Sequence, residues 1–199
     1  MMFMNKCVTG VRSFPARHAF SFLLPVLIIV TGCASVGARA GVSTENARII
    51  KGVPFYPQKE NQCGPATIAA VLNYWGIPVT PVEAAREIYS RSARGTLSID
   101  MVLYAKGKGL ESSWYSGGPD DLRNEINAGL PLIVLVDRGF SFLQVNHFMV
   151  VVGYNEKGVI VNSGEDEKEF IPMSEFLRSW ERTKYWTLLI KKPRVISKE

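Results

Sequence analysis

The chain has 199 residues, of which 47% are hydrophobic and 21% charged, a composition typical of one globular domain and unlike that of a disordered or fibrous protein. Its formal charge of +5 arises near the amino terminus, because Lys6, Arg12 and Arg17 precede Cys33 with no acidic residue among them. The remaining 20 basic residues nearly balance the 18 acidic ones, which argues against a nucleic-acid-binding protein.

Residues 1–32 have the pattern of a bacterial export signal. The basic region is followed by an apolar run over residues 19–30, which is shorter than the ~20 residues of a membrane-spanning helix and contains Pro25. Small residues then precede Cys33, and this resembles the lipobox of bacterial lipoproteins. The resemblance implies cleavage before Cys33 and lipidation of its thiol. The alternative is an uncleaved short anchor with an incidental cysteine.

The rest of the chain divides into a tether, a domain and a tail. Residues 33–47 are small and polar and predict a flexible tether behind the lipidated cysteine. The domain is expected over residues 48–193, with a C-terminal tail over 194–199. Ala34 stands where an Asp retains lipoproteins in the inner membrane, so the resemblance implies anchoring in the cell envelope, at the outer membrane facing the periplasm.

Helices are predicted for the first half of the domain. A first helix has apolar residues at helical intervals and ends at Gly76. Thr80 and Glu83 form a capping box for the second helix, and Ser98 is expected to cap the third. The predicted helices span residues 63–74, 81–90, 98–105 and 120–128.

The second half of the domain predicts mainly strands. Its short, continuous apolar runs are rich in β-branched residues, which is typical of buried strands, and a turn sequence at residues 155–158 indicates a hairpin. Helices followed by an antiparallel sheet make the α+β fold class. The predicted strands span residues 131–136, 147–152, 159–161, 169–171 and 185–190, with an extended or edge segment at 49–56 and a further helix at 172–181.

Cys63 would be the single thiol of the mature domain, since Cys7 leaves with the signal and Cys33 carries lipid. No internal disulfide can then form. An isolated cysteine is either a small buried core residue or a reactive thiol. Cys63 directly precedes Gly64 and Pro65 at the start of a predicted helix, where unpaired N–H groups lower the pKa of a thiol.

His147 would be the single histidine after Cys33, because His18 also belongs to the signal. It is expected at the beginning of a strand, at a strand edge near one end of the sheet. A lone histidine is often a core residue bonded to a backbone carbonyl. One cysteine and one histidine in an exported domain instead indicate a nucleophile and its base.

Three segments together resemble one family. Residues 58–66 (QKENQCGPA), 73–76 (NYWG) and 147–154 (HFMVVVGY) are similar to the peptidase C39 family and its C39-like relatives, over roughly residues 50–165. The resemblance implies a papain-like fold, with the N-terminal helical half packed on the C-terminal sheet. It also implies Cys63 as nucleophile, His147 as base and Gln58 as the side chain that helps to hold the oxyanion; Gln62 matches less well. The best-known members cut leader peptides after a double glycine.

The position of the third catalytic residue departs from the family. Its members usually carry an Asp, followed by Pro, after the strand that follows the histidine strand, and here Ser163 occupies that place, sixteen residues beyond His147. Asn162 could orient the imidazole instead, as an amide does in papain-type enzymes. Asp166 is a further candidate if the loop folds back.

The remaining patterns predict little further chemistry. Cys63 and His147 are 84 positions apart without ligand-spaced partners, so we expect no metal and no cofactor. Five aromatic residues are interpreted as core packing rather than as a substrate groove. These are Tyr74, Trp75, Trp114, Trp180 and Trp186.

The sequence therefore predicts a cysteine peptidase that cleaves peptide bonds at the cell envelope. Its partners would be a peptide or protein substrate and, through the lipid, the membrane. Acyl transfer to an amine by the same pair of residues is not distinguished from hydrolysis. The alternative function is a lipid-anchored C39-like protein that binds or assembles peptides without efficient turnover.

Overall fold

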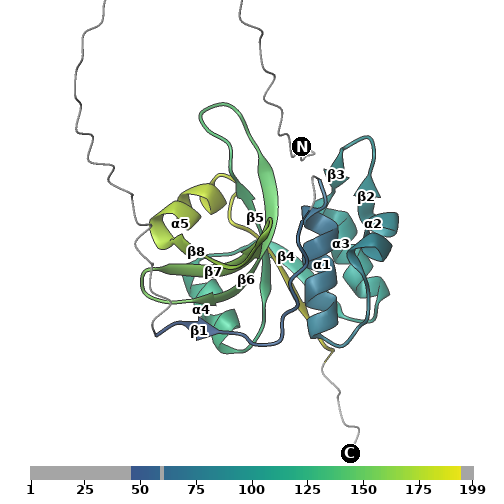
Figure 1. Cartoon of the computed structure of the whole chain (residues 1–199), viewed down its shortest axis with the longest axis horizontal. Helices are drawn as coiled ribbons and strands as arrows, with labels where there is room; N and C mark the ends of the chain where they lie inside the picture. The colour runs from purple at the N-terminus through teal and green to yellow at the C-terminus, as the bar shows by residue number, and fades with distance from the viewer. Residues whose placement is uncertain (1–45, 59–60, 194–199) are drawn as a thin grey trace, which may run out of the picture. The chain divides into compact units, whose positions relative to one another are not determined.

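A computed structural model of the chain describes residues 46–58 and 61–193 (Figure 1). The predicted signal peptide, the proposed lipidation site at Cys33, almost all of the tether and the C-terminal tail lie outside the described residues. Within the described part, none of the helices has the length and apolar character needed to cross a membrane.

Five helices and nine strands make up the described part of the chain. The helices are α1 (Cys63–Tyr74), α2 (Pro81–Ile88), α3 (Ser98–Gly107), α4 (Pro119–Asn127) and α5 (Met173–Glu181). The strands are β1 (Arg48–Ile49), β2 (Tyr89–Ser90), β3 (Gly95–Thr96), β4 (Glu111–Ser116), β5 (Leu132–Asp137), β6 (Asn146–Tyr154), β7 (Gly158–Ser163), β8 (Asp166–Pro172) and β9 (Trp186–Lys191).

Seven of the strands form one antiparallel sheet. Its order is β4-β9-β5-β6-β7-β8, and β1 pairs with the end of β6 where β5 no longer does. Every residue of β5 and β7 is buried, because α1 packs against β6 while α5 packs against β5 and β7. Figure 1 shows these two helices on opposite sides of the sheet. The predicted α+β class, with helices packed on an antiparallel sheet, is confirmed.

The central helix α1 has the bounds that its sequence predicts, and its residues from Gly64 to Leu72 are all buried. Its C-terminal end is held by two side chains: the Tyr74 hydroxyl donates to Gly129 O (2.7 Å), and the Trp75 indole N–H donates to Ile190 O (2.8 Å). Gly129 lies shortly before β5, so this end of α1 is fixed beside the start of that strand.

The structure differs from the predicted caps, helix bounds and strands in several places. Ser98 is the first residue of α3 and not its cap, since Leu97 holds the N-cap position without a side-chain hydrogen bond. The capping box of α2 is confirmed, but the helix ends at Ile88. Strand β4 is not evident from the sequence, because its side chains are mostly polar and exposed, as is typical of an edge strand, which here pairs with β9.

Candidate active site

His147 is the second residue of β6, at the beginning of a buried strand as expected, and β6 is an interior strand of the sheet. Its side chain is 6% exposed, and its Nε2 atom lies 3.0 Å from the hydroxyl of Ser163. Ser163 is the last residue of β7 and is almost fully buried. The structure therefore brings together two of the residues that the sequence selects.

Asn162 and Asp166 do not occupy the position beside the imidazole. The Asn162 side chain is engaged elsewhere, at an irregularity of the β7–β8 pairing between Val161 and Ser163. Its side-chain oxygen accepts a hydrogen bond from the backbone N–H of Lys168 (3.0 Å), which closes the β7–β8 hairpin. Asp166 begins β8 with an exposed side chain. Of the three candidates for orienting the ring, Ser163 is the one in contact with it.

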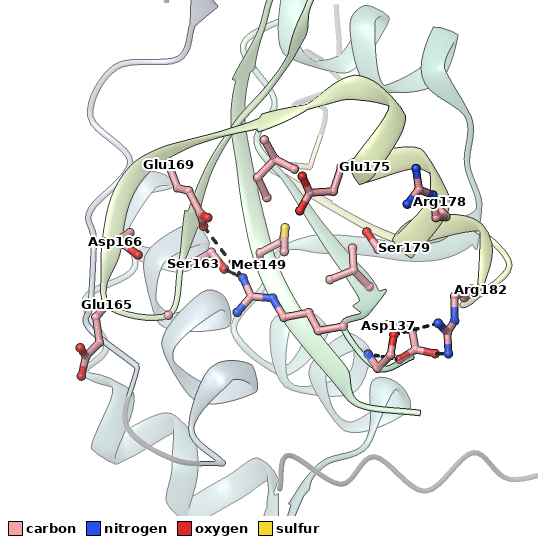
Figure 2. A pocket seen from close by; sticks show the side chains of 15 residues that line it. Asp137, Met149, Ser163, Glu165, Asp166, Glu169, Glu175, Arg178, Ser179 and Arg182 are labelled. Atoms are coloured by element: carbon pink, nitrogen blue, oxygen red, sulfur yellow. Dashed lines mark hydrogen bonds and ion pairs between the residues drawn. The ribbon is translucent and has the colours of Figure 1, made fainter. Parts of the chain in front are cut away.

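Arg138 is a residue of this site that the sequence does not single out. It directly follows β5, and its Nη2 atom donates a hydrogen bond to the Ser163 hydroxyl (2.6 Å). The same atom lies 3.9 Å from a carboxylate oxygen of Glu169 on β8. Figure 2 shows Ser163 and Glu169 on one wall of a cavity, with these contacts dashed. No local pattern signals this arginine, because its partner is 25 positions away.

The surroundings of His147 disfavour its charged form. Burial lowers the pKa of the imidazole, and the positive charge of Arg138 lowers it further, to about 3. The ring is therefore neutral at physiological pH. A carboxylate in the place of Ser163 would act in the opposite direction.

Cys63 is the first residue of α1. The opposite end of α1 is fixed beside the start of β5, so the amino-terminal end points toward the end of β5 and the start of β6, where His147 lies. The N-cap residue Gln62 makes no side-chain cap, and the first turn contains no acidic residue. The positive end of the helix dipole is thus left to act on the thiol.

Gly64 allows a second element to approach the start of α1. A Cβ atom at this position would lie 2.5 Å from the Cβ and Oγ1 atoms of Thr96 on β3. Any side chain here would displace β3 or the helix start. The position of Cys63 is therefore set by close packing as well as by its helix.

Gln58 precedes Cys63 on a segment that is tied to the histidine side of the site. Its backbone N–H donates to the carbonyl oxygen of Gly164 (2.8 Å), the residue after Ser163. Its side-chain oxygen is buried and has no hydrogen-bond partner in the described part of the chain. A buried, unpaired amide oxygen costs about 1–3 kcal/mol, so this oxygen is available to a hydrogen-bond donor of a ligand.

An apolar pocket of about 550 Å³ has chain neighbours of the site in its walls, although neither Cys63 nor His147 is among its lining residues. On one side, the pocket is lined by Leu97, which follows Thr96, the residue packed against Gly64. On the other side, it is lined by Asn146, which precedes His147. Trp114 was expected in the core but lines this pocket with 56% of its surface exposed, whereas Trp180 is fully buried as predicted. Further walls come from Ile99, Leu135 and Trp186.

A second cavity of about 550 Å³, the charged pocket, lies against α5 and the β7–β8 hairpin (Figure 2). Its walls combine carboxylates and guanidinium groups. Among the described residues, no three His, Cys, Asp or Glu side chains are grouped to hold a metal ion. The charged pocket is lined by Asp137, Arg138, Glu169, Glu175, Arg178 and Arg182, among others.

A cysteine at the start of a central helix, a buried histidine on a packed antiparallel sheet and an upstream glutamine define the papain-like class of cysteine peptidase folds. The chain belongs to the Peptidase_C39 like family, whose profile matches residues 50–188. The family suggested by the sequence motifs is thereby confirmed.

Named relatives support this assignment. The chain is 28% identical over 142 residues to the lactococcin-G-processing and transport ATP-binding protein LagD of Lactococcus lactis subsp. lactis, an alignment that covers 70% of this chain and 19% of LagD. The chain thus spans about a fifth of that relative. It is also similar to a solved double glycine motif protease from an AMS/PCAT transporter, in complex with a leader peptide, at 28% identity and a TM-score of 0.58, covering 71% of this chain and 93% of that one.

A more distant structure shows the same fold. A protein from Bacillus anthracis, described as a C39-like peptidase, aligns with a TM-score of 0.62 at 18% identity, over 73% of this chain and 97% of that chain.

Proposed function

We propose that this protein is a cysteine peptidase in which Cys63 attacks the substrate carbonyl and His147 transfers the proton. The observation that carries the proposal is the buried His147–Ser163 pair at the end of the sheet toward which Cys63, at the positive end of α1, is directed. The neutral imidazole is the form that accepts a proton. Membership of the C39-like family supports the same assignment.

The reaction follows from the roles of these groups. As the Cys63 sulfur bonds to the carbonyl carbon, its proton passes to His147, which then protonates the leaving amine. The Gln58 amide and the backbone N–H of Cys63 would hold the oxyanion, and each such donor contributes about 2.7–4 kcal/mol. Water then hydrolyses the thioester. If an amine attacks the thioester in place of water, the outcome is acyl transfer.

The apolar pocket supports a substrate with a large apolar side chain beside the cleaved bond. Among the described residues that line it, Arg182 and Lys184 are the charged ones and none is a carboxylate. A glycine would leave a volume of about 550 Å³ unfilled. We therefore infer a preference different from the double glycine motif named for the transporter protease.

We further propose that Cys33 carries a lipid and holds the domain at the cell envelope, at the outer membrane facing the periplasm. The basic and apolar pattern of residues 1–32 and the small residues before Cys33 support this. A Cys33→Ser variant should move from the membrane fraction to the soluble fraction of the cell. Its retention in the membrane would contradict the proposal.

A peptide-binding protein without efficient turnover is the second candidate. Ser163 stands where the family usually has a carboxylate, and Arg138 donates a hydrogen bond to it; burial and the charge of Arg138 make His147 a weaker base. Such a protein would keep the apolar pocket and use it to hold a peptide in the envelope.

Cleavage of a peptide library by the full-length protein in detergent, followed by mass spectrometry, tests the proposal. We expect cleavage beside large apolar residues and its loss, by at least about 10³-fold, in Cys63→Ala and His147→Ala. Peptides bound but not cleaved by wild type would instead establish the second candidate.

Two glutamines provide a matched pair of variants. Gln58→Ala should lower kcat by about 10²–10³-fold, the usual effect of removing an oxyanion donor. Gln62→Ala, at an N-cap that makes no side-chain hydrogen bond, should change kcat less than about threefold. Equal effects of the two substitutions would remove Gln58 from the oxyanion site.

A further inference from the structure

Strand β6 joins two opposite ends of the sheet. His147 is its second residue, at the reactive end, and Tyr154, its last residue, pairs with Arg48 on β1. The seven residues between these positions correspond to about 24 Å along a strand. Figure 1 shows β1 at one end of the sheet and the β5–β6 loop at the other. Residues 46–48 therefore join the sheet at the end remote from the site, the entry end.

The strand register places three further segments at the entry end. The turn between β6 and β7 directly follows Tyr154. Strand β9 ends here, because its Leu189 pairs with Leu132, the first residue of β5. Strand β4 begins here, because its Glu111 pairs with Lys191, the last residue of β9, and α3 ends shortly before β4. Segments far apart in the sequence thus meet at one end of the sheet.

These segments and β1 carry six basic side chains that are exposed to solvent, the basic group. In the described part of the chain, none of the six forms an ion pair. Arg48 donates a hydrogen bond to the carbonyl oxygen of Asn127 (3.2 Å), and the Lys108 ammonium lies over the ring of Tyr104. The basic group consists of Arg48, Lys51, Lys106, Lys108, Lys157 and Lys192.

Carboxylates at the entry end offset only part of this charge. Glu111 pairs with Lys191 (3.5 Å), and Glu83 is occupied in the capping box of α2. Within the described ranges, this leaves Glu125 and Glu156 to face the basic group. At the reactive end, by contrast, the two arginines beside the site are each paired with a carboxylate. The two ends of the sheet therefore differ in charge.

We propose that the basic group lies against the anionic headgroups of a lipid bilayer, so that the reactive end of the domain faces the aqueous side. The inference rests on the proposed anchoring through Cys33. Residues 34–45 span at most about 40 Å when fully extended, a length that would let several faces of the domain touch the membrane. Cations close to an anionic surface are attracted to it, so the basic group selects the entry end.

This orientation narrows the class of substrate. The site lies about 24 Å along β6 from the entry end, well beyond the distance of about 8 Å over which physiological salt screens the charge of the headgroups. A peptide in the aqueous compartment reaches Cys63 and His147 in this orientation. A segment that stays inside the bilayer does not.

The test is the acetylation rate of individual lysines, measured by mass spectrometry on the full-length protein reconstituted into vesicles. One kind of vesicle contains phosphatidylcholine alone, and the other an equal mixture with phosphatidylglycerol. Relative to Lys184, which is exposed at the reactive end, Lys51, Lys106 and Lys192 should react at least about threefold more slowly in the anionic vesicles. Lys168, beside the start of β8, should keep its ratio to Lys184. High salt should remove the protection, because it screens the attraction.

Charge reversal provides a second measurement. In the double variant Lys51→Glu and Lys106→Glu, the protection of Lys192 should fall to less than about half of its wild-type value, because the remaining cations attract the surface less strongly. Lys168→Glu, which reverses a charge at the reactive end, is the matched control and should leave the protection of Lys192 unchanged. All three positions are exposed, so the substitutions leave the core intact.

The possible failures are distinguishable. A protein that does not float with either kind of vesicle would contradict the anchoring, and the inference would fall with it. A protein that floats, but whose entry-end lysines react equally in both kinds of vesicle or are protected in both, would overturn this inference alone. Protection in native membranes and in neither kind of vesicle would assign the basic group to an acidic protein partner and overturn the lipid as its occupant.

Discussion

The apolar pocket and the charged pocket have the same volume, about 550 Å³, and opposite linings. The first exposes indole rings and aliphatic side chains, and its wall includes Asn146, the residue before His147. The second gathers carboxylates and guanidinium groups around Ser163. The difference separates two tasks: one side of the site is suited to holding a substrate side chain, and the other controls the charge of the base.

Arg182 belongs to both pockets and marks the boundary between them. Its guanidinium pairs with the buried carboxylate of Asp137 and donates to the carbonyl oxygens of Gly139, Ser141 and Leu143 in the β5–β6 loop. This loop forms part of the wall between the two cavities. A substitution of Asp137 is therefore the first test of how the two pockets are kept apart.

Asp137→Asn should have the largest effect on stability, lowering the free energy of unfolding by about 3 kcal/mol, because it breaks a buried ion pair. Urea denaturation measures this loss. Arg123→Gln is the control, since its pair with Asp120 is exposed on α4 and should be worth less than about 0.5 kcal/mol. Equal losses would mean that the wall between the pockets does not depend on the buried pair.

The pH dependence of the free energy of unfolding is the next test, and it concerns the charge state of His147. The pKa of His147 is about 3 in the folded protein and about 6.5 in the unfolded chain. Below pH 6.5, the unfolded chain therefore binds a proton at this residue that the folded protein does not bind. Stability should fall by about 2 kcal/mol between pH 7 and pH 5 from this residue alone. Urea titrations of wild type and His147→Gln measure it, and the variant should lack this slope. A wild type equally stable at both pH values would contradict a buried neutral ring.

The smallest expected effect, on kcat/KM, tests which of the two pockets binds the substrate side chain. Trp114→Ala should lower kcat/KM for a substrate with a large apolar residue about tenfold, because an aromatic wall of the apolar pocket is lost. Glu175→Gln, in the charged pocket, should change it less than about twofold. Steady-state kinetics on one peptide compares them, and a larger loss from Glu175→Gln would assign substrate binding to the wrong cavity.

Much of the fold could be predicted because its signals are local. The apolar spacing of α1, the Thr80–Glu83 capping box and the β-branched runs of β5 to β7 each depend on residues close together in sequence. Strand β4 was missed for the opposite reason. Its polar side chains lie on an edge strand, where pairing with β9 and not its own pattern defines it.

The candidate site could likewise be predicted only where its residues stand out in the sequence. Cys63, His147 and Ser163 stand out because each is isolated or occupies a recognisable place in a motif. Arg138 is one arginine among many in the sequence, and only the fold brings it to Ser163 across 25 positions. The exposure of Trp114 likewise depends on how elements pack, which a single sequence does not express.

The β5–β6 loop has one more consequence. Phe140 and Phe142 are 73% and 95% exposed, yet the backbone that carries them is held by Arg182 and closes so tightly at Gly139 that a Cβ there would overlap the Leu143 carbonyl oxygen. A segment ordered in advance loses little conformational entropy when another surface meets it. Two exposed aromatic side chains are thus carried on a backbone that is already held, so ordering this backbone adds little to the entropic cost of a contact with them.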